Sequence, residues 1–129
     1  IYLVNSSITV NGGDILGESF GIILFGSNCI IEGGMITGGT VGVHVTGYYN
    51  GKNNLGSSST CIIEGGMITG GTYCVLVQDY KYRDADGNVL VIDGGTCTIK
   101  GGSFNHDPSE YVAEGYAATL NSKMLLWLI

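Results

Sequence analysis

The sequence predicts an all-β fold, a right-handed parallel β-helix (β-solenoid) of about four coils closed by a C-terminal cap. The first observation is an internal repeat, because residues 29–40 and residues 61–72 both read CIIEGGMITGGT. The second is the alternation of apolar and polar residues within each copy, and the third is the Gly-Gly pair that ends each short run. Repetition indicates stacked units, and alternation with glycine corners indicates short strands.

Two further copies align with this repeat. Residues 8–15 (ITVNGGDI) and 97–104 (CTIKGGSF) align with residues 29–36, so coils start near residues 8, 29, 61 and 97. The first six residues, IYLVNS, align with residues 22–27. The chain is therefore expected to begin in the middle of a coil.

Alternation divides each coil into inward and outward side chains. The inward set of the second coil is small and apolar: Cys29, Ile31, Ile36, Val43 and Val45. The outward set is mixed: Ile30, Glu32, Met35, Thr37 and His44. The inward positions stay apolar in the other copies, as a continuous core requires. Parallel crossover connections are strongly right-handed, which gives the expected hand of the coil.

The domain organisation expected is a solenoid over residues 1–107 and a closing segment, or cap, over residues 108–129. The cap is expected to pack through four residues: Tyr111, Val112, Tyr116 and Leu120. A short stack exposes unpaired strand edges at its ends. The expected partners are therefore neighbouring repeats or domains of a longer chain, with a homo-oligomer through the solenoid ends as an alternative.

The repeated sequence pattern GG-x-I-x-GG-T resembles the pectin-lyase-like right-handed β-helix repeats in surface and adhesin proteins of Gram-positive gut bacteria and their phages. The tail, residues 101–116 (GGSFNHDPSEYVAEGY), is similar to the segment that closes many of those arrays. The resemblance implies a β-helix and an extracellular location, on a cell surface or virion, more than any activity. The ending MLLWLI, residues 124–129, is more apolar than in that family.

The charge excludes some classes of partner. The formal net charge is -6 with five basic residues. Nucleic acids and anionic membrane surfaces are bound by clustered Lys and Arg, which this chain lacks. The terminal apolar run is also far shorter than the roughly 20 residues of a membrane-spanning helix, so no membrane insertion is expected.

The four cysteines fit a core better than a metal site. Cys29, Cys61 and Cys97 share an inward column with Ile8, and Cys74 belongs to another column. Adjacent strands lie about 4.8 Å apart, which is compatible with a disulfide, so the disulfide state stays open. Buried thiols are favoured because isoleucine fills the same column and three stacked cysteines cannot all pair. No CxxC spacing exists, and no metal or cofactor is expected.

Two insertions lengthen consecutive coils at the same corner, residues 46–60 and residues 78–96. Insertions that map to one face often form the binding side of a repeat protein. The candidate ligand-binding residues are Tyr48, Tyr49, Asn50, Tyr80, Tyr82 and Arg83. Aromatic rings beside polar groups suit contact with glycans. The alternative is a pair of solvated loops whose tyrosines pack on the coil flank, since loops tolerate insertion at little cost.

Other acidic residues are candidates for a calcium site or a catalytic carboxylate pair. Asp84 to Asn88 begins like a calcium loop, but Val89 stands where an EF-hand needs glycine, so a hairpin turn is predicted. Glu32 and Glu64 stack at about the carboxylate spacing of a retaining glycosidase. They lie on a plain strand rather than in a cleft, so no catalytic residue is assigned.

The expected function is a non-enzymatic structural or adhesive module of a secreted cell-surface or phage protein. The corner insertions would contact glycans. The main alternative is a fragment of a carbohydrate-active β-helix enzyme, a polysaccharide lyase or glycoside hydrolase. A third hypothesis, ice binding, rests on stacked threonines such as Thr37 and Thr69.

Overall fold

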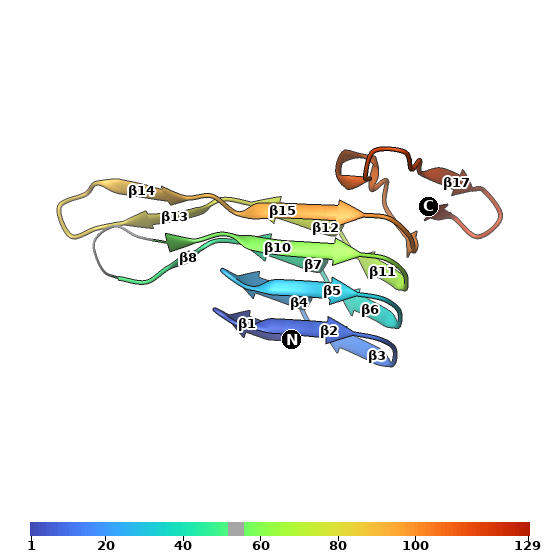
Figure 1. Cartoon of the computed structure of the whole chain (residues 1–129), viewed down its shortest axis with the longest axis horizontal. Coiled ribbons are helices and arrows are strands. Elements are labelled where there is room, and N and C mark those ends of the chain that lie inside the picture. Colours follow the sequence, from blue (N-terminus) through green and yellow to red (C-terminus); the bar gives the residue numbers. More distant parts are fainter. Residues whose placement is uncertain (52–55) are drawn as a thin grey trace.

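The computed structural model describes residues 1–51 and 56–129. The described chain is all-β, with three sheets built on parallel strands, three antiparallel hairpins, one of which joins a large sheet, and one short 3-10 helix, η1 (Ser109–Tyr111) (Figure 1). The all-β class expected from the sequence is therefore confirmed.

The chain passes through three sheets in turn. Sheet B contains β2 (Ser7–Val10), β5 (Asn28–Ile31), β10 (Ser59–Ile63) and β15 (Gly95–Ile99). Sheet C contains β3 (Asp14–Gly17), β6 (Met35–Gly38), β11 (Met67–Gly70) and β16 (Ser103–Phe104), followed by the antiparallel β18 (Leu126–Leu128) and β17 (Thr119–Asn121). Sheet A contains β1 (Tyr2–Val4), β4 (Phe20–Phe25), β7 (Val41–Thr46) and β12 (Tyr73–Gln78).

The register of the parallel strands follows the repeat. Cys61 lies opposite Cys29 on one side and opposite Cys97 on the other. In sheet A, Tyr2 lies opposite Ile23, so β1 is paired with the strand that the alignment of the first six residues predicted. The copies aligned in the sequence therefore lie side by side in register.

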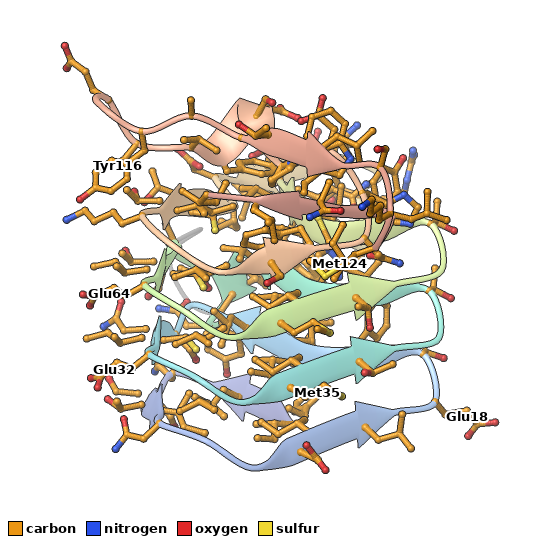
Figure 2. All side chains as sticks on the ribbon, turned by 90° about the vertical axis from the view of Figure 1, so that its right-hand side faces the viewer. Glu18, Glu32, Met35, Glu64, Tyr116 and Met124 are labelled. Atoms are coloured by element: carbon orange, nitrogen blue, oxygen red, sulfur yellow. The ribbon has the colours of Figure 1, made fainter. Side chains whose placement is uncertain are left out.

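The core is one continuous cluster between the three sheets. The five inward residues predicted for the second unit are all buried: Cys29, Ile31, Ile36, Val43 and Val45. The outward residues Ile30 and Met35 are exposed, and Met35 projects from the face of sheet C in Figure 2. The period-two pattern therefore predicted the inward apolar side chains of this unit correctly.

The glycine corners bring successive units close together. Gly66, between β10 and β11, has a φ of +91°, and a Cβ built there would lie 2.9 Å from the Gly34 carbonyl oxygen. A side chain at this corner would strain the backbone and push the units apart, which explains why glycine is repeated there.

A second corner, between sheets A and B, is held by serine hydroxyls. The Ser59 hydroxyl donates to the Thr46 carbonyl at 2.6 Å and accepts from the Ser27 N–H at 3.0 Å. The Ser27 hydroxyl in turn accepts from the Ser6 N–H at 3.1 Å. Ser27 and Ser59 are 1% exposed, so this ladder satisfies backbone groups that water cannot reach. The sequence analysis did not identify it.

All four cysteines are buried free thiols, as the sequence favoured. A hydrogen bond with Cys61 and burial raise the pKa of Cys29 far above its ordinary value. The pKa of Cys61 is also raised, by its hydrogen bond with Cys97 and by burial, although the bond with Cys29 acts in the opposite direction. The Cys29 and Cys61 thiols therefore remain protonated, and all three stacked cysteines serve as core residues.

The closing segment caps the stack through a different set of residues than expected. Tyr111 and Val112 pack against the core as predicted. The prediction for Tyr116 and Leu120 is wrong, because they are 50% and 47% exposed. Figure 2 shows Tyr116 at the margin of the cap.

Part of the apolar ending takes the place of those two residues. Trp127 in β18 and Ile129 pack against the core, and β18 pairs with the edge of β16. An antiparallel strand can return directly onto the sheet, which the repeat pattern alone could not indicate. Within the described residues, no helix is long and apolar enough to span a bilayer.

Candidate functional site

The two insertions form one structure, here called the hairpin arm. Its first hairpin pairs β8 (Tyr48–Tyr49) with β9 (Gly56–Ser57), and its second pairs β13 (Tyr80–Arg83) with β14 (Val89–Ile92). The hairpins extend β7 and β12, which are neighbours in sheet A, so they leave the stack at the same end. Figure 1 shows the arm projecting to the left of the sheets.

One isoleucine packs between the two hairpins. Ile92, at the end of β14, is 7% exposed. A Cβ at Gly47 would lie 2.5 Å from its side chain, and a Cβ at Gly56 would lie 2.3 Å from it. The absence of side chains at both glycines therefore makes the room that Ile92 fills against the first hairpin.

An aromatic pair joins the hairpins further out. The Tyr49 and Tyr82 rings stack, with centroids 4.4 Å apart and planes 26° apart. Tyr49 is partly buried and Tyr82 is 36% exposed. Two residues that lie far apart in the sequence thus form one continuous aromatic surface, and the prediction that the two insertions lie at the same corner is confirmed.

The other predicted residues have mixed positions. Tyr48 and Tyr80 are partly buried, and Tyr80 lies opposite Ile92 in the β13–β14 pair. Asn50 is exposed directly after β8. Residues 52–55 of the first insertion lie outside the described residues. The arrangement therefore brings Tyr49 and Tyr82 together and leaves Tyr48 and Tyr80 nearer the stack.

Arg83 lies on the opposite strand face from Tyr82, since neighbouring residues of a strand point to opposite sides. Arg83 lies across from Val89, and Lys81 lies across from Val91. All four side chains are exposed. The arm thus has an aromatic face turned toward the first hairpin and a basic, aliphatic face turned away from it.

A hollow of about 230 Å³ lies near the tip of the arm, lined by Tyr82, Asp84, Asn88, Val89 and Leu90. The sequence analysis considered Asp84 and Asn88 only as parts of a turn. Their place beside Tyr82 follows from the hairpin register, which sets Tyr82 opposite Leu90. The hollow therefore adds polar groups to the exposed edge of the aromatic pair.

The turn at the tip has the hairpin geometry that the sequence predicted. One carboxylate oxygen of Asp84 accepts hydrogen bonds from the backbone N–H groups of Asp86, at 3.0 Å, and Asn88, at 2.8 Å. Gly87 has a φ of +83°, which suits a tight turn. In residues 1–51 and 56–129, no cluster of three His, Cys, Asp or Glu residues could hold a metal ion.

The remaining polar candidates are spread over the stack. Glu32 and Glu64 are exposed and lie one above the other at the same corner, as Figure 2 shows. His44 lies on the outside of sheet A between Ile23 and Leu76, with its ring 5.2 Å from the Phe20 ring. None of these residues lines the hollow near the tip of the arm.

Searches among protein-family models, curated proteins and solved structures find no match to this chain.

Proposed function

We propose that the chain is a right-handed parallel β-helix module whose stacked units form a rigid support. Three parallel sheets, visited in turn by successive strands, favour this description. The stacked inward columns and the ladders of glycine and serine corners also favour it. In this proposal the edges of β1, β2 and β3 pair with neighbouring repeats of a longer chain.

The functional part of this proposal is a non-enzymatic structural or adhesive role in a secreted protein of a cell surface or virion. The hairpin arm would contact glycans. The observation that carries the proposal is the stacked pair of Tyr49 and Tyr82, presented on an arm that projects from the stack. A plain spacer has no need of such an extension.

The chemistry of the arm suits a sugar ring. The exposed part of Tyr82 offers an apolar surface, and Asp84 and Asn88 line the same hollow with polar atoms. Glycan sites combine an aromatic platform with a few polar groups that fix the orientation of hydroxyls. The hollow is small, at about 230 Å³, which agrees with weak contact to part of an exposed chain of sugars rather than with enclosure of a substrate.

The test is a glycan array probed with the wild-type protein, the Tyr82→Ala variant and the matched Tyr73→Ala variant. Tyr73 is 47% exposed and lies in sheet A, outside the arm. We expect wild-type binding to a subset of glycans, weakened roughly tenfold or more by Tyr82→Ala. The Tyr73→Ala variant should bind as the wild type does.

Two results would count against the proposal. Equal losses in both tyrosine variants would indicate non-specific aromatic adhesion. Absence of binding to every glycan by a folded wild-type protein would leave the module as a structural spacer, with the arm serving another purpose.

A further inference from the structure

The three sheets differ at the C-terminal end of the stack. In sheet B, Val112 forms a parallel bridge with Ile99, and the Ala113 N–H donates to the Ile99 carbonyl at 2.9 Å. In sheet C, β18 pairs with β16. In sheet A, no strand among the described residues pairs with the edge of β12 that faces away from β7. The cap therefore covers two edges and leaves the third open.

Two hollows follow this open edge. One has a volume of about 380 Å³ and is lined by residues 73–77 of β12 together with His106, Asp107, Glu110 and Tyr111 of the closing segment. The other, of about 580 Å³, is lined by Val77, Gln78, Asp79 and Lys81. They share Val77. Together they form a groove along β12, with the closing segment as a wall over its first part.

The closing segment meets this groove with side chains and a loop carbonyl instead of a paired strand. The Val77 N–H donates to the Tyr111 hydroxyl at 3.3 Å, and the Cys74 thiol donates to the His106 carbonyl at 3.6 Å. These contacts do not form a ladder. A strand edge without a paired strand is a template for pairing with another extended chain.

The apolar core is also incomplete at this edge. Val77 ends an inward column in which Leu24 and Val45 are 0% exposed, whereas Val77 is only partly buried. A further strand would bring one more apolar side chain into this column. Burial of apolar surface would then add to the backbone hydrogen bonds.

The charge of the wall indicates the chemistry of that strand. Asp107 and Glu110 are exposed, and both line the groove. The protein as a whole carries a formal charge of -6. In the second hollow Asp79 and Lys81 offset each other. A segment that carries Lys or Arg over the first hollow would therefore be attracted there, and an acidic segment would be repelled.

We propose that the open edge of β12 binds an extended basic segment of a partner protein, which adds to sheet A as its next strand. Alternate apolar residues of the segment cover Val77 and Tyr111, and its basic residues face Asp107 and Glu110. This is recognition by strand addition, in which main-chain hydrogen bonds supply affinity and alternate side chains supply specificity. It is independent of glycan contact by the hairpin arm.

The probe is a short fluorescent peptide in which valine alternates with lysine and threonine. Its binding to the native protein is measured by fluorescence anisotropy at low salt. We expect saturable binding that weakens as salt is added, because exposed charges are screened. The same peptide with every backbone amide N-methylated should not bind, because it has no N–H group to donate to a strand edge.

A charge reversal locates the site. Glu110→Lys should weaken binding by roughly fivefold, the size expected for a partly exposed charge contact. Glu114→Lys makes the same change on an exposed residue that does not line the groove, and should leave binding unchanged. Hydrogen exchange should show new protection at Val75 and Val77 when the peptide is bound.

Several results would overturn the proposal. Equal binding by the N-methylated peptide would exclude strand addition. Equal effects of the two lysine variants would exclude the groove. Protection at β1, β2 or β3 in place of β12 would place the peptide at the other end of the stack. Absence of binding by the unmodified peptide would also overturn it.

Discussion

At the scale of single residues, the stack depends on polar groups as well as on its apolar columns. Ser27 and Ser59 are almost fully buried, yet each hydroxyl has backbone partners. Their positions repeat with the units, so the same hydrogen bonds recur at successive corners. A residue type that composition alone would assign to loops is thus part of the interior.

We predict that Ser59→Ala lowers the free energy of unfolding by about 1–3 kcal/mol, because the Ser27 N–H and the Thr46 carbonyl lose a partner. The exposed neighbour Ser58 provides the matched control, and Ser58→Ala should change stability by less than about 0.5 kcal/mol. Chemical denaturation of the three proteins measures the difference. Equal stability of the two variants would show that the ladder contributes nothing.

His44 gives the fold a dependence on pH. Among the described residues neither ring nitrogen has a hydrogen-bond partner, and both are buried. Burial lowers the pKa of His44 below its ordinary value, and the neighbouring Gln78 side chain offsets part of this. The folded protein therefore holds the neutral ring, whereas the unfolded chain takes up a proton below about pH 6.5. The resulting stabilisation is present above that pH and is lost as the pH falls.

We predict that His44→Leu reduces the loss of stability between about pH 7.5 and about pH 5.5. Leucine fits this position because Leu76 and Ile23 are its neighbours in sheet A. Chemical denaturation at both pH values gives the change in the free energy of unfolding with pH for the variant and for the wild type. The two proteins have the same carboxylates, so the contribution of these groups cancels in the comparison. Identical slopes would contradict the assignment to His44.

At the scale of elements, the two hairpins of the arm support each other. Each has its own short ladder, and they contact one another through Ile92 and the Tyr49–Tyr82 pair. Isolated two-stranded hairpins are marginal in water. Their order therefore depends on these contacts.

We predict that Ile92→Ala separates the hairpins, with a cost of about 2–4 kcal/mol to the local stability of β13 and β14. Val91, next in the strand, is 51% exposed, and Val91→Ala should have little effect. Hydrogen exchange of the Tyr82 and Leu90 amides, which face each other at a hydrogen-bonded position of the ladder, reports the local opening. Unchanged protection in the Ile92→Ala variant would show that other contacts hold the arm.

At the scale of the whole molecule, the four thiols report on the integrity of the stack. They come from the second, third and fourth units, and each is between 0% and 8% exposed. A cysteine reacts with a thiol reagent only when its sulfur is exposed and deprotonated. The raised pKa values of Cys29, Cys61 and Cys74 oppose the deprotonation of these thiols.

We predict that the native protein reacts with a thiol reagent only at the rate at which it unfolds. A Ser58→Cys variant, with one exposed thiol, should react immediately at that site and serves as the control. Rapid reaction of one thiol in the folded wild type would show that a unit opens separately from the rest.

The sequence predicted most of the stack and only part of what surrounds it. The alternation of apolar and polar residues identified Ile31 and Ile36 as core residues, because successive side chains of a strand point alternately to its two faces. It assigned Tyr116 and Leu120 to the interior incorrectly, since the cap has no repeat to set its register. Trp127 takes that role through an antiparallel return. For the site, the sequence located both insertions but not the pairing of Tyr49 with Tyr82.

The sequence alone determined the all-β class, the register of the units and the position of the arm, because each is a periodic property of the chain. Tertiary structure alone decided which tyrosines meet, which cap residues are buried and which sheet edge remains open. The physical reason is that these contacts join residues with no fixed spacing in the sequence. They form only where separate segments happen to be brought together, as at Ile92 and along the edge of β12.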